Sequence, residues 1–89
     1  FNFLKKLCMI NNNLNSIPTE FNNLTELKEL NISSNKIGVI SIQITNLLNL
    51  ETLILNNNGI KNIPMEINNL LNLKILCLSY NQITIIPIE

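Results

Sequence analysis

Five amino-acid types, Ala, Arg, Asp, His and Trp, are absent from the 89-residue sequence. Without His and Asp, the sequence lacks the most common general base, a common metal ligand and most carboxylate pairs. Only Glu, Lys, Cys and Tyr remain as side chains for chemistry. We therefore expect no catalytic residue, no metal site and no cofactor, and a protein that is not an enzyme.

The sequence also lacks an excess of charge of either sign. Its 6 Lys and 6 Glu residues give a formal net charge of zero. Nucleic acids and anionic lipids are bound through strongly basic surfaces, so neither is an expected partner. No secretory signal and no apolar run of about 18 residues occurs, so membrane insertion is not expected either.

Three amino-acid types dominate what is present. The chain contains 19 Asn, 16 Leu and 16 Ile, which together make up 51 of its 89 residues. An Asn-rich composition with few charges is often disordered and prone to β-aggregation. Whether the chain is disordered or folded therefore depends on whether these residues follow a regular period.

The sequence is built from a 23-residue unit that recurs without insertion or deletion. Seven positions are apolar in every unit that contains them: the first, fourth, sixth, eleventh, fourteenth, eighteenth and twenty-first. The first apolar residue and the ninth-position Asn of the successive units are Leu4, Leu27, Leu50 and Leu73, and Asn12, Asn35, Asn58 and Asn81. This regularity excludes disorder and predicts a repeat protein.

The unit begins LKKLCMINNNL, LKELNISSNKI, LETLILNNNGI and LKILCLSYNQI. This pattern, L-x-x-L-x-L-x-x-N-x-L, resembles the leucine-rich repeat family. The continuations IPTEFNNL and IPMEINNL resemble its 23-residue intracellular class, found in Ras-pathway scaffold proteins, although Ser41 stands where that class prefers Pro. The resemblance implies an α/β solenoid: a right-handed coil with a four-stranded parallel concave sheet and short convex helical turns.

The residues themselves agree with this architecture. From the third to the seventh position apolar and variable residues alternate, as in a strand that is buried on one face. Pro18, Pro64 and Pro87 each follow an Ile, and Pro is well suited to the first position of a helix. The Asn-rich segments that follow are poor helix formers, so we expect a single turn or a 3₁₀ helix in each unit.

We interpret residues 1–89 as a single leucine-rich repeat segment with repeats 4–26, 27–49, 50–72 and 73–89. The sequence begins and ends inside a unit, and no polar cap is visible. A solenoid needs polar terminal units to cover its stacked core. We expect that the segment is an excerpt of a longer repeat domain, or that coils of neighbouring chains associate end to end.

The repeated Asn residues and the two Cys residues have structural rather than chemical interpretations. A buried Asn can satisfy backbone groups of its own and neighbouring coils, so we expect these side chains to point inward. Cys8 and Cys77 share the fifth position three strands apart, roughly 14 Å, which is too far for a disulfide. Two unpaired thiols indicate a reducing compartment, and we predict a cytoplasmic protein.

The variable positions of the strands should form the concave face, and one group of them is unusually apolar. Four residues on the third and fourth strands form what we call the concave patch: Ile54, Ile75, Cys77 and Tyr80. Glu51 and Lys74 border it as a charged rim. An apolar patch with an aromatic residue and a polar rim is typical of a partner-binding surface. The alternative is that these are scattered surface residues, which are common in soluble proteins.

Two other surface groups carry less weight. Lys5, Lys6 and Lys28 beside Glu29 suggest a solvated mixed-charge face rather than a site for acidic peptides. Leu48 and Leu71 occupy equivalent positions on the convex side, where the first repeat has Thr25. We expect these two Leu side chains to be half-buried between coils.

The sequence thus predicts a non-catalytic protein-protein interaction module that binds a protein on its concave face. The resemblance implies a scaffold in intracellular signalling, with a small GTPase, a phosphatase or a kinase as partner. One alternative is a regulatory or sensor segment of a larger multidomain signalling enzyme. A second is a self-assembling structural array, formed by end-to-end self-association of uncapped coils.

Overall fold

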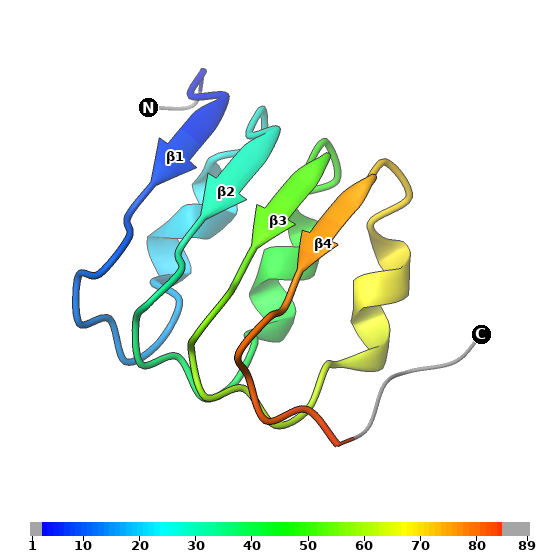
Figure 1. Ribbon diagram of the computed structural model, residues 1–89. Coiled ribbons are helices and arrows are strands. Elements are labelled where there is room, and N and C mark those ends of the chain that lie inside the picture. Colours follow the sequence, from blue (N-terminus) through cyan, green and yellow to red (C-terminus); the bar gives the residue numbers. More distant parts are fainter. Residues whose placement is uncertain (1–2, 85–89) are drawn as a thin grey trace.

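A computed structural model describes residues 3–84, in which short strands alternate with 3₁₀ helices (Figure 1). The strands are β1 (Lys6–Cys8), β2 (Glu29–Asn31), β3 (Thr52–Ile54) and β4 (Ile75–Cys77). The helices are η1 (Thr19–Asn23), η2 (Ile42–Asn46) and η3 (Met65–Asn69). Each strand and the helix after it belong to one coil, as the repeat predicts.

The four strands form one parallel sheet in the order β1-β2-β3-β4. Their central residues pair in sequence, Leu7 with Leu30, Leu30 with Leu53, and Leu53 with Leu76. Each strand covers only the third to fifth positions of the unit, which is shorter than the alternation suggested. Backbone bonds between coils continue beyond it, for example from Met9 N–H to the Asn31 carbonyl at 2.8 Å. The prediction of a four-stranded parallel sheet is confirmed.

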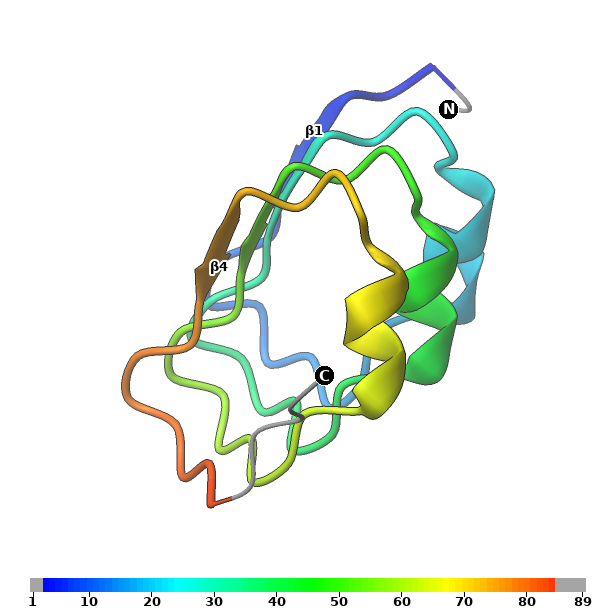
Figure 2. The ribbon, with the colours of Figure 1, turned by 90° about the vertical axis from the view of Figure 1, so that its right-hand side faces the viewer.

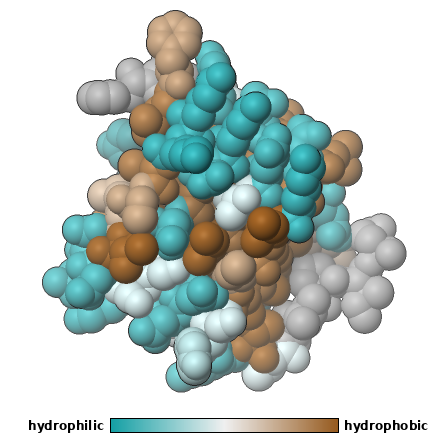
Figure 3. All heavy atoms as spheres, turned by 45° about the horizontal axis from the view of Figure 1, so that its top comes forward, coloured by the Kyte–Doolittle hydropathy of each residue, from teal (hydrophilic) through white to brown (hydrophobic). Residues whose placement is uncertain are grey.

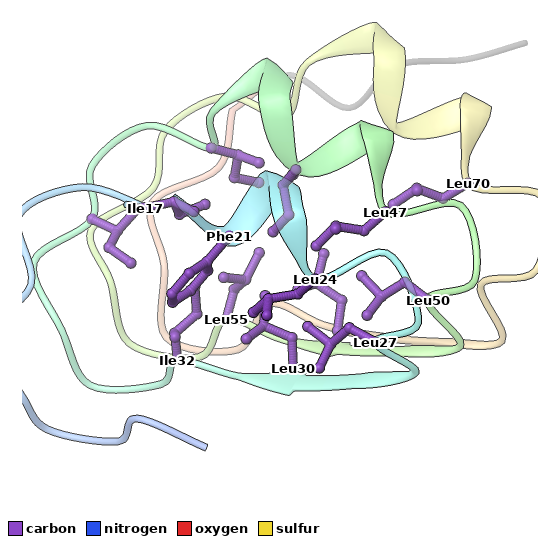
Figure 4. Close-up of a cluster of buried hydrophobic side chains, with 14 of the residues drawn as sticks. Ile17, Phe21, Leu24, Leu27, Leu30, Ile32, Leu47, Leu50, Leu55 and Leu70 are labelled. Atoms are coloured by element: carbon purple, nitrogen blue, oxygen red, sulfur yellow. The ribbon is translucent and has the colours of Figure 1, made fainter. Parts of the chain in front are cut away.

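The sheet and the helices form two layers with the apolar core between them (Figures 2 and 4). The repeated apolar positions of the second coil, such as Leu27, Leu30 and Ile32, are fully buried. Leu53 and Leu55 in the third coil are equally inaccessible. Ile37, Ile44 and Leu47 from the other segments of the second coil are buried with them, so the core runs continuously along the stack.

The short helices follow the predicted sites but begin one residue later than expected. Pro18 and Pro64 lie immediately before η1 and η3, in extended conformation, and not at the first helical position. Their carbonyls accept the first helical bonds, from the N–H groups of Phe21 and Ile67, both at 3.1 Å. Pro is compatible with this place because it needs no N–H partner and its φ is fixed near that of the turn. Pro87 lies outside the described residues.

Ser41 fills the same place before η2. Its carbonyl accepts from Ile44 N–H at 3.2 Å, as the Pro carbonyls do in the other coils. In addition its Oγ accepts from Gln43 N–H at 3.2 Å. The departure from Pro at this position therefore leaves the turn intact, with a side-chain cap in place of the rigid ring.

The repeated Asn side chains form a hydrogen-bonded ladder along the stack. Asn58 Oδ1 accepts from the backbone N–H groups of Asn35 at 3.1 Å and Ile37 at 3.4 Å in the preceding coil. Asn58 Nδ2 donates to the Ile32 carbonyl of that coil and to the carbonyls of Leu55 and Asn56 in its own. The structural interpretation of these residues therefore agrees with their contacts.

The same pattern is present at two further positions of the ladder. Asn35 Oδ1 accepts from the N–H groups of Asn12 and Leu14, at 2.8 and 3.0 Å. Asn81 Oδ1 accepts in the same way from two backbone N–H groups of the third coil. Asn12 itself is exposed, against the expectation that all four point inward. Its amide donates to the Ile10 carbonyl of its own coil, because no coil in the described part precedes it.

The outer coils are less well packed than the middle ones. In the first coil Leu4, Leu7 and Met9 are only partly buried, and in the last coil Leu76 is 37% exposed. Within residues 3–84, each of these side chains has a neighbouring coil on one side only. The core of these residues is closed in the second coil, nearly closed in the third, where Ile67 is half-buried, and partly open at both outer coils.

The expectation of half-buried Leu48 and Leu71 is wrong. Their side chains are 57% and 89% exposed. The preceding residues, Leu47 and Leu70, occupy the core position of that turn and are 0% and 5% exposed. Because the chain turns back toward the strand here, consecutive side chains point to opposite sides.

Candidate functional site

Three members of the concave patch lie together on the sheet. Ile54 on β3 pairs with Cys77 on β4, and Thr52 pairs with Ile75. In each strand the central Leu points into the core, so the residues before and after it face the opposite, concave side. Ile75 is 51% exposed, whereas Ile54 and Cys77 are half-buried. This face of β3 and β4 therefore carries three neighbouring apolar side chains, of which Ile75 is the most exposed.

Tyr80 lies in the turn after β4 and not on the strand itself. Its side chain is 87% exposed and its backbone has a φ of +58°. The equivalent residues of the other coils, Asn11, Ser34 and Asn57, have the same left-handed conformation. Left-handed backbone is unfavourable for a bulky residue and is tolerated more easily by Asn. An exposed aromatic ring therefore lies in the turn that follows β4, at a position where small polar residues fit better.

The two residues of the charged rim, Glu51 and Lys74, immediately precede β3 and β4. Lys74 N–H and Ile75 N–H both donate to the Glu51 carbonyl, at 2.8 and 3.0 Å. These backbone bonds place Glu51 and Lys74 side by side in neighbouring coils. Glu51 is half-buried and Lys74 is exposed. The rim therefore places one carboxylate and one ammonium group beside the concave patch.

A hollow of about 220 Å³ extends the concave face from this patch toward β1. It is shared with the patch through Ile54 and is also lined by Thr52, Asn31 and Cys8. The sequence reasoning did not include these three residues in the site, although their shared third and fifth positions place them on the same face. The concave patch is thus one end of a longer surface that crosses all four strands.

The mixed-charge group borders the hollow on its β1 side. Lys6 Nζ lies 3.9 Å from a Glu29 carboxylate oxygen, and both side chains are at least half exposed. Such a pair contributes at most about 1 kcal/mol to stability. Figure 3, in which this face is seen obliquely, shows hydrophobic and hydrophilic side chains next to one another.

The described residues offer little for chemistry. Cys8 and Cys77 are free thiols on the two outermost strands. Among residues 3–84, no cluster of three or more His, Cys, Asp or Glu side chains is placed to hold a metal ion. No helix within this part of the chain is long and apolar enough to cross a membrane.

The stacked coils, the single parallel sheet and the Asn ladder define a solenoid repeat protein. Comparison with family models finds a match of residues 26–47 to the leucine-rich repeat and of residues 48–89 to a model of two leucine-rich repeats. Together these matches cover more than half of the chain, and the protein belongs to the leucine-rich repeat family. No curated protein sequence gives a significant match.

Solved structures show the same fold. A leucine-rich repeat protein of Leptospira interrogans is similar with a TM-score of 0.91 and 37% identity, over 94% of this chain and 21% of that one. The leucine-rich repeat ectodomain of the receptor kinase SOBIR1 from Arabidopsis thaliana is similar with a TM-score of 0.73 and 33% identity. That match covers 84% of this chain and 42% of the ectodomain. The chain therefore spans less than half the length of either protein.

Proposed function

We propose that the protein is a non-catalytic interaction module that binds a protein partner on its concave face, through the concave patch and its charged rim. Leucine-rich repeat domains generally mediate protein-protein interaction. The choice of surface rests on the exposure of Ile75, at 51%, beside Ile54 on one face of the sheet, and of Tyr80, at 87%, in the turn after β4.

Ile75 and Tyr80 bury little apolar area within the chain and would bury much more against a partner. Tyr80 buries almost nothing within the chain and occupies an unfavourable backbone region. Aromatic residues with a polar rim are enriched where binding energy is concentrated, because they bury a large area with few rotatable bonds. Glu51 and Lys74 would fix the orientation of the partner through paired charges.

The repeat itself supplies substitutions that test this without disturbing the coil. Tyr80→Asn and Ile75→Thr introduce the residues that stand at the equivalent positions in the third coil, Asn57 and Thr52. We expect the double variant to keep or slightly raise the melting temperature, since Asn relieves strain of about 1 kcal/mol at a left-handed position. Affinity for a captured partner should fall by about tenfold or more.

A matched control uses the convex side. Leu71→Thr also removes an exposed apolar residue and introduces the residue found at the equivalent position, Thr25. Binding measured by calorimetry or surface plasmon resonance should be unchanged in this variant. Equal loss of affinity in both variants, or none in the double variant, would reject the concave patch as the binding surface.

The class of partner rests on the sequence pattern. The 23-residue unit with its I-P-x-E continuation supports a cytoplasmic signalling scaffold whose partner is a small GTPase, a phosphatase or a kinase. Crosslinking in cells through a photoreactive group at position 80, followed by mass spectrometry, would identify the partner and its compartment. A partner confined to the cell exterior would contradict the cytoplasmic assignment.

Two alternatives have specific support. The likeness to the ectodomain of a receptor kinase favours a sensor or regulatory segment of a larger signalling enzyme. The partly exposed core of the outer coils favours a second copy of the chain as partner in a self-assembling array. In either case the concave face remains free for a further contact.

A further inference from the structure

Asn58 stands out from the other 18 Asn residues of the chain because Gly59 follows it. Gly59 has a φ of +70°. An Asn followed by Gly is chemically the least stable Asn context, since a residue without a Cβ leaves its backbone nitrogen accessible to the Asn side chain. This labile pair coincides with a central position of the buried ladder.

The reaction available to this pair is intramolecular amide exchange. The backbone nitrogen of Gly59 attacks the side-chain carbonyl carbon of Asn58, a new carbon-nitrogen bond forms, and the bond to Nδ2 breaks. The Gly59 nitrogen gives its proton to the solvent, the departing nitrogen takes one from it, and ammonia leaves. Water then opens the resulting cyclic imide at either carbonyl, giving aspartate or isoaspartate.

In the folded chain the Asn58 amide is held away from this reaction. The residue is 3% exposed. Its Oδ1 accepts from the preceding coil and its Nδ2 donates to three backbone carbonyls, at 3.0 to 3.2 Å. Its own N–H donates to Asn81 Oδ1 of the next coil at 2.8 Å. Both the side chain and the backbone of Asn58 would have to leave these partners before the ring could close.

The product could not return to the same place. A carboxylate has no hydrogen with which to replace the three donations of Nδ2, so it would face three carbonyl oxygens in a buried site. Isoaspartate would also add an atom to the backbone in a coil whose pairing depends on a fixed length. Opening of the third coil therefore exposes the chain to a change that refolding cannot reverse.

We propose that the Asn58-Gly59 pair is a site of spontaneous deamidation that the fold suppresses, and that modification there marks chains that have remained unfolded and prevents their return to the solenoid.

The test compares the folded and the unfolded 89-residue chain. Samples are kept at mildly alkaline pH with and without guanidinium, digested, and analysed by mass spectrometry for deamidation at each Asn. We expect modification at position 58 to be on the order of tenfold or more slower in the folded chain, because it requires opening. The unfolded samples are then diluted, and the fraction that regains the native circular dichroism signal should fall in parallel with that modification.

The matched control is Gly59→Asn. The equivalent position of the first coil is Asn13, with a φ of +59°, and a Cβ at Gly59 would meet no atom within 4 Å. Asn at this left-handed position adds backbone strain, so we expect a somewhat lower stability. The variant should still fold, deamidate far more slowly at position 58 when unfolded, and keep its ability to refold. A third variant, Asn58→Asp, should behave as the modified product and show a lower melting temperature than the parent chain.

Three results would overturn the proposal. One is equal deamidation at position 58 in folded and unfolded samples. The second is an equal loss of refolding in the parent chain and in Gly59→Asn. The third is a melting temperature of Asn58→Asp that matches the parent chain, since a tolerated carboxylate could not prevent refolding.

Discussion

At the scale of single residues, the stability of the solenoid depends on polar side chains inside it as well as on the apolar ones. A buried Asn replaces water for backbone groups of two coils at once, and no buried side-chain polar atom in the described residues lacks a hydrogen-bond partner. Leaving a buried backbone group unpaired costs about 1 to 3 kcal/mol. The four Asn positions therefore differ in importance according to how many coils surround them.

Asn58→Ala and Asn12→Ala make this difference measurable. The first removes the partners of Asn35 N–H and Ile37 N–H in a closed coil, so we expect a loss of about 3 kcal/mol or more in the free energy of unfolding. The second removes an exposed side chain that donates to Ile10 of its own coil, and should cost about 1 kcal/mol or less. Chemical denaturation followed by circular dichroism gives both values; similar costs would contradict the ladder as described.

At the scale of the element, each strand is too short to be stable alone, and its contribution depends on its neighbours. Leu30 and Leu53, at the centres of β2 and β3, have a paired strand on both sides and are 0% exposed. Leu76 has the same place in β4 at the edge of the sheet and is 37% exposed. Identical residues in identical elements thus bury different areas.

The same substitution in two strands should therefore have unequal effects. Leu53→Ala leaves a cavity in a closed core and is expected to lower the free energy of unfolding by about 3 to 5 kcal/mol. Leu76→Ala removes a partly solvated side chain whose surroundings can collapse, and about 1 to 2 kcal/mol is expected. Denaturant midpoints of the two variants check this, and a cost of Leu76→Ala equal to that of Leu53→Ala would show that the edge strand is covered in solution.

At the scale of the whole molecule, both outer coils of the described residues expose apolar side chains. The first coil has an apolar hollow of about 490 Å³ lined by Leu4, Leu7, Met9 and Leu24 among others. The last coil exposes Leu76 beside partly buried Leu78. A first coil stacked on a last coil would repeat the contact that already exists between neighbouring coils, in a head-to-tail arrangement that does not close.

The 89-residue chain is accordingly expected to associate with itself as its concentration rises. The weight-average mass from sedimentation should increase with concentration, and Leu76→Lys should suppress the increase by placing a charge on the stacking surface. Tyr80→Asn, on the concave face, is the control and should leave the association unchanged. A monomer at all concentrations would indicate that the outer coils are covered in another way.

Most of the fold could be predicted because the same apolar pattern occurs four times at a fixed interval. A single apolar residue at the position of Leu30 is ambiguous, but its recurrence at an interval of 23 residues fixes the strand, the register and the inward face together. The exposure of Leu48 and Leu71 could not be predicted in this way. The pattern distinguishes buried from exposed positions by polarity, and these two residues are apolar although they are exposed. Only the path of the turn decides which of two consecutive Leu side chains points inward.

The candidate site was predictable in part for the same reason. Ile54, Ile75 and Cys77 lie together because the period places them on neighbouring strands, and the structure brings them to one face. The hollow across Cys8, Asn31 and Thr52 was not predicted, because a curved surface depends on how the strands stack and not on which residues they carry. The left-handed conformation of Tyr80 was not predicted either, because it follows from the geometry of the turn, which is the same as that of Asn57 in the preceding coil.

The constant offset of 23 residues between neighbouring strands has a consequence for how such a chain can change its length. Neighbouring coils pair through the same backbone groups each time, and the Asn oxygen of each coil accepts from the backbone of the coil before it. A duplicated segment of one whole unit would therefore find matching surfaces on both sides, whereas a partial one would misplace every contact beyond it. Length can grow or shrink in steps of one coil, and the area of the concave face is set by the number of copies in the gene.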